Sequence, residues 1–288
     1  MRLDDLGTNI NVEDRRGRFG GRGVRMGGGL SLGSLALIAI ASLVFGVNPL
    51  DLISNSGQEL SVDETANAPA GSADAGTACR KDEVSLLSCR VLGSTDALWT
   101  AQFAAAGAQY RKPTLVFYSQ SDVSGCGAAQ AAMGPFYCPS DERIYLDTDF
   151  YRELSERFGA AGDFAQAYVI AHEVGHHVQH LMGLADQVRT AQQRAGQSEA
   201  NRLQVKMELQ ADCFAGMWAG QNRDRIEPGD IEEGMRAANA IGDDTLQRQA
   251  GQRVTPDSFT HGSSEQRKAW LRRGLESPDP QQCDTFNR

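Results

Sequence analysis

Four of the five histidines of this chain fall within residues 172–180, and residues 172–176 read His-Glu-Val-Gly-His. This H-E-x-x-H spacing places His172 and His176 on one face of a helix, where both imidazoles can bind the same zinc ion. Glu173 is rotated about 100° around the helix axis and can reach a water on that ion as general base. The pattern therefore predicts a hydrolytic zinc site.

A catalytic zinc needs a third protein ligand and one open position. A metzincin would carry a third histidine six residues after His176, but Met182 occupies that position. His180 lies about 12 Å along the helix axis from His172, which is too far for one ion. We therefore expect Glu208, on the next long predicted helix, to be the third ligand.

Two further side chains are expected to support the site. Asp212 follows Glu208 by one helical turn, so it is expected to accept the free N–H of a ligand imidazole. His261 is the only histidine outside residues 172–180. A peptidase needs a donor for the developing oxyanion, and His261 is the first candidate for that role. Weaker candidates are Tyr145, Tyr168 and Arg267.

The elements that must position these residues are mostly helices. Apolar periodicity and turn residues predict one helix over 162–182, which carries the H-E-x-x-H residues, and another over 199–221. Two short β-rich runs, 113–118 and 143–147, predict a small sheet, with a loop over 124–139 between them. The expected fold class is α+β, a zincin-like and mostly helical domain. Further helices are expected over 95–110 and 148–158 and at the capping-box patterns of 230–233 and 263–266.

The chain has six cysteines and no C-x-x-C pair, and all six follow residue 78. An even number with these spacings is typical of three disulfides in an oxidising compartment. Six cysteines allow 15 pairings, which the sequence alone does not decide. The simplest arrangement joins neighbours along the chain, as Cys79–Cys89, Cys126–Cys138 and Cys213–Cys283.

Residues 26–50 contain no charged side chain, and the run from Leu30 to Val47 is long enough to cross a bilayer as a helix. A cleaved signal peptide is disfavoured because its apolar region is usually only about 7–15 residues long. Arginine-rich flanks stay in the cytoplasm. The sequence predicts a cytoplasmic segment (1–25), a single inner-membrane span (26–50), a flexible linker (51–77) and a periplasmic metallopeptidase domain (78–288).

The formal net charge is −9 at pH 7, with 28 basic against 37 acidic residues. Phosphate contacts need clustered cations, so a nucleic-acid partner is not expected. The one basic cluster lies directly before the apolar stretch, where its predicted role is to orient the chain in the membrane. That cluster comprises Arg15, Arg16, Arg18, Arg22 and Arg25.

Four segments of the chain resemble the bacterial putative neutral zinc metallopeptidase family. They are His-Glu-Val-Gly-His-His-Val-Gln at 172–179, Gly-Pro-Phe-Tyr-Cys-Pro at 134–139 ahead of Ile-Tyr-Leu-Asp at 144–147, residues 208–212, and Thr-His-Gly-Ser-Ser at 260–264. The resemblance extends over nearly the whole chain. It implies a membrane-anchored, zincin-like peptidase in which Glu208 is the third zinc ligand, and it implies a class of enzyme rather than a substrate.

The leading hypothesis is zinc-dependent hydrolysis of peptides or proteins outside the cytoplasmic membrane. Water polarised by zinc would lose a proton to Glu173 and attack a carbonyl of an extended peptide. An exposed strand edge, formed by residues 143–147, would align that peptide. One alternative is a non-catalytic, metal-stabilised binding or assembly factor, although a structural zinc has no use for a base such as Glu173. A second alternative is hydrolysis of a non-peptide amide, such as a cell-wall linkage.

Overall fold

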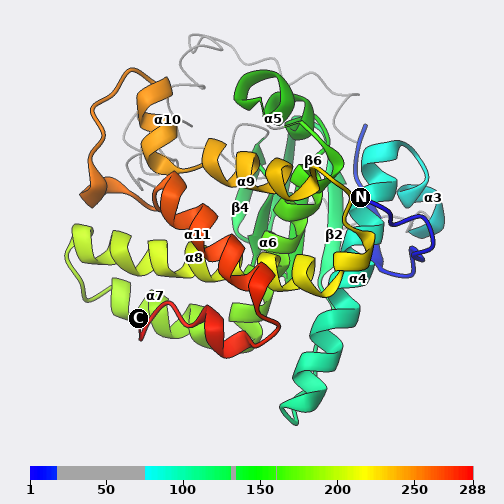
Figure 1. The fold of residues 1–288 in the computed structure, drawn as a ribbon, viewed down its shortest axis with the longest axis horizontal. Coiled ribbons are helices and arrows are strands. Elements are labelled where there is room, and N and C mark those ends of the chain that lie inside the picture. The colour runs from blue at the N-terminus through cyan, green and yellow to red at the C-terminus, as the bar shows by residue number, and fades with distance from the viewer. Residues whose placement is uncertain (18–74, 131–133, 160, 288) are drawn as a thin grey trace, which may run out of the picture.

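The computed structural model describes residues 1–17, 75–130, 134–159 and 161–287 (Figure 1). Helices pack on one another and on a small sheet, so the expected α+β class is confirmed. Helix α6 (Asp163–Leu181) lies at the centre, in contact with α4 (Glu83–Ala105), α8 (Gln197–Gln221) and α9 (Asp230–Ala240). The helix with the H-E-x-x-H residues is therefore the central helix of the core.

The main sheet has the order β1-β2-β6-β5. Strands β1 (Asn11–Asp14), β2 (Thr114–Tyr118) and β6 (Arg143–Asp147) are parallel, and β5 (Phe136–Cys138) is antiparallel to β6. The predicted strands 113–118 and 143–147 are confirmed as the two central strands. Both are apolar and buried over most of their length, as strands inside a parallel sheet are.

The expectation that residues 143–147 form an exposed edge is wrong, because β6 pairs with β2 on one side and with β5 on the other. The edge on that side is β5, which lies inside the predicted loop 124–139. That range also contains parts of a separate hairpin of β3 (Ser121–Ser124) and β4 (Gly127–Gln130). Strands of three or four residues rich in Gly, Ala and Ser lack the β-branched pattern that predicts a strand.

The predicted helices over 162–182 and 199–221 are confirmed as α6 and α8. Helix α4 begins at Glu83 rather than residue 95, because Asp82 caps it by accepting the backbone N–H of Ser85. The remaining helices are α3 (Ala75–Cys79), α5 (Phe150–Phe158), α7 (Leu184–Gln192), α10 (Asp243–Gln249) and α11 (Ser264–Glu276), with 3-10 turns at Arg223–Arg225, Pro256–Ser258 and Pro280–Cys283.

The two predicted capping boxes have different outcomes. At α11, the Ser263 side chain accepts the backbone N–H of Gln266 and the Gln266 side chain accepts that of Ser263, which confirms the box. At α9 the N-cap is Gly229 and there is no side-chain cap. The Asp230 carboxylate instead accepts the backbone N–H of Glu227, so the box predicted at 230–233 is wrong.

The predicted disulfide pairing is confirmed for all six cysteines. Cys79–Cys89 joins α3 to α4, Cys126–Cys138 ties the end of the hairpin to β5, and Cys213–Cys283 fastens the C-terminal turn to α8. Cys126 is exposed, whereas the other five half-cystines are fully buried. The disulfides therefore brace the edges of the helical core and one end of the sheet.

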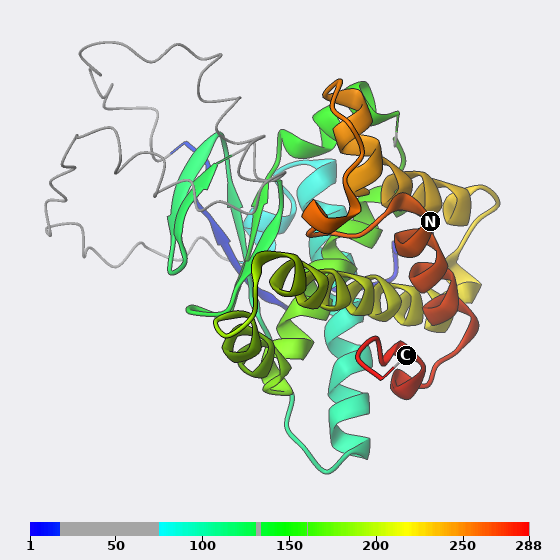
Figure 2. The same cartoon turned by 90° about the vertical axis from the view of Figure 1, so that its left-hand side faces the viewer.

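Residues 1–17 were predicted to form a cytoplasmic segment apart from the folded domain, together with residues 18–25. For residues 1–17 this separation is wrong, because β1 pairs with β2 and the side chains of Leu3, Ile10 and Val12 enter the main core. Figure 2 shows β1, in blue, running along the green strands of the sheet. Helix α3 also begins at Ala75, inside the predicted linker.

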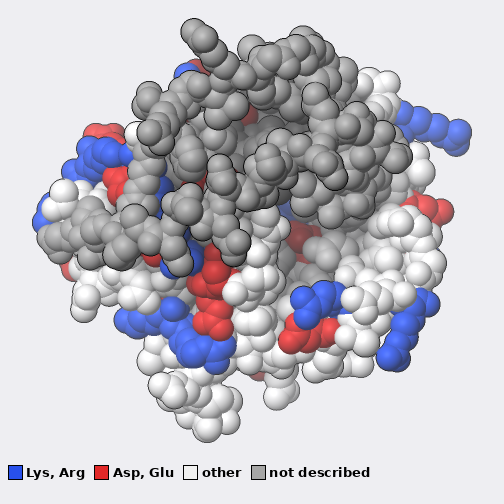
Figure 3. All heavy atoms as spheres, turned by 180° about the vertical axis from the view of Figure 1, so that it is seen from behind, with Lys and Arg blue, Asp and Glu red and all other residues white. Residues whose placement is uncertain are grey.

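The apolar stretch 26–50 lies outside the described residues. Among the helices that the structure does describe, none combines the length and the apolar character needed to cross a bilayer. On the face shown in Figure 3, basic and acidic side chains are interspersed over the described residues and do not form one large surface of a single sign.

Candidate metal centre

Helices α6 and α8 bring together the three predicted zinc ligands. The Nε2 atoms of His172 and His176 lie 3.2 and 3.5 Å from Glu208 Oε2. One ligand atom from each of these residues lies within 4.8 Å of the other two. His172 and Glu208 are 7% and 6% exposed, so both side chains are largely buried. This donor set of two imidazoles and one carboxylate suits zinc.

Gly175, inside the H-E-x-x-H residues, sets the distance between the two helices. A Cβ atom at this position would lie 2.9 Å from the Cα atom of Ala211 on α8. Such a separation is too short for two carbon atoms, so only glycine allows α6 and α8 to approach this closely. The close approach is what lets the Glu208 carboxylate reach between His172 and His176.

Asp212 contacts His172 as predicted, and it is fully buried. Its Oδ1 lies 2.8 Å from His172 Nδ1. Because an ionised carboxylate can only accept, His172 donates from Nδ1, which leaves Nε2 as the nitrogen that could lose its proton and bind a metal. Tyr168 donates its hydroxyl to the same oxygen at 2.6 Å. Asp212 thus fixes the tautomer and the orientation of one ligand.

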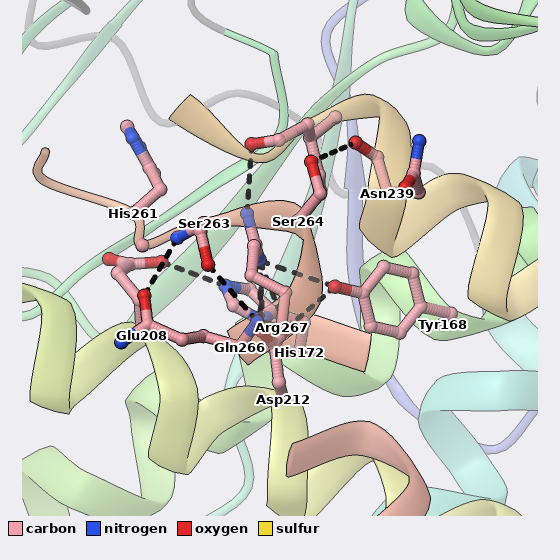
Figure 4. A network of polar contacts seen from close by, with 12 residues as sticks. Tyr168, His172, Glu208, Asp212, Asn239, His261, Ser263, Ser264, Gln266 and Arg267 are labelled. Carbon is pink, nitrogen blue, oxygen red and sulfur yellow. Dashed lines mark hydrogen bonds and ion pairs between the residues drawn. The ribbon is translucent and has the colours of Figure 1, made fainter. Parts of the chain in front are cut away.

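Arg267 of α11 lies in the middle of this network, between Tyr168 and Glu208 (Figure 4). Its Nε and Nη2 donate to the two oxygens of Asp212, each at 2.9 Å, and Nη2 also donates to the Tyr168 hydroxyl. Arg267 is 2% exposed. Both Arg267 and Tyr168 are committed to Asp212, so the structure does not favour either as oxyanion donor. A third candidate, Tyr145, donates to Asp141 and lies in a separate apolar cluster of the sheet.

Two glutamines that the sequence analysis missed complete the surroundings of the ligands. Gln179 Oε1 lies 2.9 Å from His176 Nδ1, and its amide nitrogen donates to the Met207 carbonyl and to Gln210. Gln204 donates to Glu208 Oε1 at 2.9 Å. The only sequence signal was helical spacing, since Gln179 lies three residues after His176 and Gln204 four before Glu208.

Glu173 lies beside the ligands and against strand β5. It is 7% exposed, and the backbone N–H of Tyr137 donates to its carboxylate. Burial raises the pKa of Glu173, and the nearby His172 and His176 oppose this effect without cancelling it. A carboxylate with a raised pKa takes up a proton more readily, as a general base must during turnover. The general base and the sheet edge are therefore in direct contact.

Burial alone would raise the pKa of Glu208, but the positive charge of His176 and the hydrogen bonds from His172 and His176 hold it well below its usual value. Burial alone would lower the pKa of His172, yet Asp212 raises it to about 10. The pocket thus stabilises positive charge beside Glu208. A divalent cation bound there would replace the protons of His172 and His176 and supply the positive charge itself.

His261 lies near Glu208 and on the opposite side of the network from Tyr168 (Figure 4). Its Nδ1 is 3.2 Å from Asp243 Oδ1. The other oxygen of Asp243 accepts the backbone N–H groups of Thr260, His261 and Gly262. Burial lowers the pKa of His261, but Asp243 and Glu208 outweigh that effect and raise it. Asp243, absent from the sequence predictions, thus positions the His261 loop.

The other two clustered histidines face away from the ligands. His177 donates from Nε2 to the Arg111 carbonyl, and its Nδ1 accepts the Tyr137 hydroxyl. Burial lowers the pKa of His177 to about 4, so this histidine is neutral. His180 Nε2 lies 3.6 Å from Glu142. His180 is not among the residues whose ligand atoms lie together, as its distance along the helix predicted.

Among the described residues, one other group of acids is close enough to hold a cation: Asp163, Asp230 and Glu233. It contains no histidine, and two of its members are only partly buried. The amino group of Met1 donates to Asp163 and Asp230. Zinc prefers nitrogen and sulfur ligands alongside carboxylates, so His172, His176 and Glu208 form the better zinc site.

The family model described as Putative neutral zinc metallopeptidase matches residues 1–286. The chain belongs to this family. Two relatives, both called Uncharacterized protein YpfJ, from Escherichia coli strains K12 and O6:H1, are 45% identical to it over 295 aligned residues. The alignments cover 100% of this chain and 99% of YpfJ.

A more distant family relative is Uncharacterized protein Rv2575 of Mycobacterium tuberculosis H37Rv. It is 40% identical over 215 residues, which cover 69% of this chain and 70% of Rv2575. No solved structure shows significant similarity to the chain. The family resemblance expected from the sequence is thus confirmed, and it extends to the N-terminal residues that form β1.

Proposed function

We propose that this protein is a zinc-dependent metallopeptidase in which His172, His176 and Glu208 hold the metal and Glu173 is the general base. The observation that carries the proposal is that ligand atoms of two histidines and Glu208 meet beside a second buried carboxylate, that of Glu173, which accepts a hydrogen bond from the backbone of strand β5. Structural zinc sites use four protein ligands, whereas catalytic sites use three and leave a position open. The three-residue group favours catalysis.

Bound zinc supplies a Lewis acid that polarises a carbonyl and lowers the pKa of water. Glu173 would accept the proton of the attacking water and return it to the leaving amine. His261, oriented by Asp243, would donate to the oxyanion as the carbonyl becomes tetrahedral. Asp212 and Gln179 would hold the two imidazoles in the tautomers that leave their Nε2 lone pairs free.

The free edge of β5 would align an extended peptide substrate. Within the described residues, strand β5 pairs with β6 on one side only, and its Tyr137 backbone reaches Glu173 on the other. Pro135 and Pro139 flank the strand and have no N–H group, so the neighbouring backbone offers mainly carbonyl acceptors. A peptide bound there would donate its own N–H groups, which places its scissile carbonyl beside the general base.

Two features support a location at a membrane outside the cytoplasm. Residues 26–50 are uncharged and mostly apolar, so they would attach the protein to the inner membrane. Three disulfides would be stable in an oxidising compartment. The substrate would then be an extracytoplasmic peptide or an unfolded protein segment.

The direct test uses the full chain in detergent, loaded with one equivalent of zinc and incubated with denatured casein and a mixed peptide library. We expect new amino termini to appear, to be lost on treatment with a chelator, and to return when zinc is restored. A zinc-loaded protein that binds peptides without cleaving them would instead support the binding-factor alternative. Cleavage of an amide-linked cell-wall fragment but of no peptide would move the proposal to that substrate class.

A further inference from the structure

The N-terminal residues are built into the domain by the backbone. Each residue of β1, from Asn11 to Asp14, has a register partner on β2, from Thr114 to Phe117. Arg15 continues the pairing, because its backbone N–H donates to the Phe117 carbonyl at 2.8 Å. The side chains of Ile10 and Val12 are 6% and 8% exposed. This strand covers an edge of the sheet that would otherwise carry unpaired backbone groups.

Arg15 connects β1 to two other strands. It donates to Glu13 with Nη2 at 2.6 Å and to Asp122 of β3 with Nη1 at 3.1 Å. Glu13 in turn accepts from Arg143 of β6 at 2.9 Å. The side chain of Arg15 is 16% exposed. Its charge is therefore neutralised within the domain.

Arg16 connects β1 to the start of α4. It donates to both oxygens of Asp14 and to Asp82, the residue that caps α4, with its side chain 9% exposed. Lys81 also donates to Asp14. Burial alone would raise the pKa of Asp14, but the hydrogen bonds from Arg16 and Lys81 lower it to about 2. Arg16 thus joins β1 to the N-terminal end of α4 through Asp14 and Asp82.

These contacts bear on the predicted role of the basic cluster in orienting the chain in the membrane. The cluster has five arginines, and its predicted role in orienting the chain in the membrane relies on all five being free charges. Arg15 and Arg16 instead have carboxylate partners inside the domain. Moreover, a strand cannot pair with its neighbour through about 30 Å of hydrocarbon.

We infer that residues 1–17 and residues 75–287 fold together in the same compartment, with β1 as a permanent strand of the domain. Residues 26–50 then do not separate a cytoplasmic N-terminus from a periplasmic domain. Residues 1–17 and residues 75–287 both lie on the side where the three disulfides form. This inference does not depend on the proposed catalytic function.

Crosslinking in intact bacteria tests the inference with the full chain. Neighbouring strands are about 4.8 Å apart, a separation that a disulfide can bridge, so Asn11→Cys and Thr114→Cys should crosslink under a membrane-permeant oxidant. A protease site placed after Gly57 allows the two segments to be separated after lysis. We expect most of the N-terminal fragment to remain attached under non-reducing conditions and to be released by reductant.

The matched control pairs Asn11→Cys with Arg143→Cys, which occupies the same register row one strand further, at about 9.6 Å. This pair is too distant to crosslink. Release of the N-terminal fragment in both variants, with the native disulfides intact, would overturn the inference.

A second measurement does not require a new disulfide. Asn9 and Arg194 are both exposed. The described cysteines are all in disulfides, so a cysteine introduced at either position would be the only free thiol in the described residues. A membrane-impermeant maleimide should label Asn9→Cys and Arg194→Cys to the same extent in spheroplasts. Labelling of Arg194→Cys alone, with Asn9→Cys reacting only after lysis, would place the N-terminus in the cytoplasm and contradict the inference.

Discussion

The candidate metal centre and the N-terminal strand are both made of clustered charged residues, yet only in the candidate metal centre did the sequence predict which residues lie close together. His172 and His176 lie four residues apart, and helical geometry alone brings them together. Glu13 to Arg16 form a similarly dense group, but their partners lie about 70 to 130 residues away on β3, β6 and α4. Local spacing fixes the first arrangement, whereas only the tertiary fold reveals the second.

The comparison also shows how one residue type can be misjudged. Arginines before an apolar stretch usually mark the cytoplasmic side of a span. In this chain, two of them form ion pairs that fasten a strand to the sheet. In the folded domain the charges of Arg15 and Arg16 are compensated by carboxylates.

The largest expected effect lies at the metal centre. Glu173→Gln removes the general base but keeps a side chain of the same shape, so hydrolysis of casein should fall by about 10²–10⁴-fold while zinc content is unchanged. The measurement is the initial rate of peptide release at equal zinc loading. Glu199→Gln, at an exposed position on α8, is the matched control and should keep full activity. Equal rates for both variants would remove Glu173 from the mechanism.

A smaller effect is expected from the residue behind His172. Asp212→Asn can still accept the imidazole N–H but loses the charge shared with Arg267, so zinc affinity should fall by about 10–100-fold. Titration against a competing chelator measures this change. The control is Asp186→Asn, an exposed acid on α7 with an ordinary surface ion pair. Unchanged affinity in Asp212→Asn would show that Asp212 does not support the ligand.

Helix α4 contacts both α6 and β2, and its buried Asp96 predicts how stability changes with pH. Burial raises the pKa of Asp96 to about 7, although Tyr110 donates to it. The folded state then holds a proton that the unfolded state has lost, so the free energy of unfolding falls as the pH rises from about 4 to 7. Asp96→Asn should remove this contribution, which for a rise of about three pKa units amounts to about 4 kcal/mol.

Thermal unfolding of the wild type and of Asp96→Asn at pH 4.5 and pH 8 measures the difference. The variant should gain stability relative to the wild type only at the higher pH. A gain for Asp96→Asn that is the same at both pH values would contradict the assigned titration.

The smallest expected effect lies at the N-terminal strand. Arg16→Ala removes the link between β1 and the cap of α4, and it should lower the free energy of unfolding by about 1 kcal/mol. Arg202→Ala breaks an exposed pair on α8 and should change it by less than about 0.5 kcal/mol. Chemical denaturation of both variants compares them. Equal stabilities would mean that Arg16 does not fasten the strand.

The sequence predicted the parts of the fold that depend on short-range patterns. Helices α6 and α8, the two central strands and the ligands on α6 follow from periodicity and spacing. Glu208 and Asp212 came from their spacing on the next helix. The disulfide pairing followed the order of the cysteines along the chain.

What could not be predicted depends on contacts between distant segments. Arg267 was considered as an oxyanion donor, but a close crossing of α8 and α11 turns it towards Asp212. At that crossing, a Cβ on Gly274 would overlap the Cys213 carbonyl oxygen. The edge strand β5 is three residues long and has no periodicity to detect. Strand β1 pairs with β2, which lies far along the chain, so the sequence near β1 does not define its pairing.

The most direct test of the central claim is the zinc K-edge X-ray absorption spectrum of the purified full-length protein with one zinc per chain. We expect two imidazole ligands and oxygen ligands, at about 2.0–2.2 Å, and no sulfur, because the described cysteines are all in disulfides. The imidazole contribution should fall by half in His172→Ala. A spectrum dominated by sulfur at about 2.3 Å, or a His172→Ala spectrum identical to that of the wild type, would contradict the site formed by His172, His176 and Glu208.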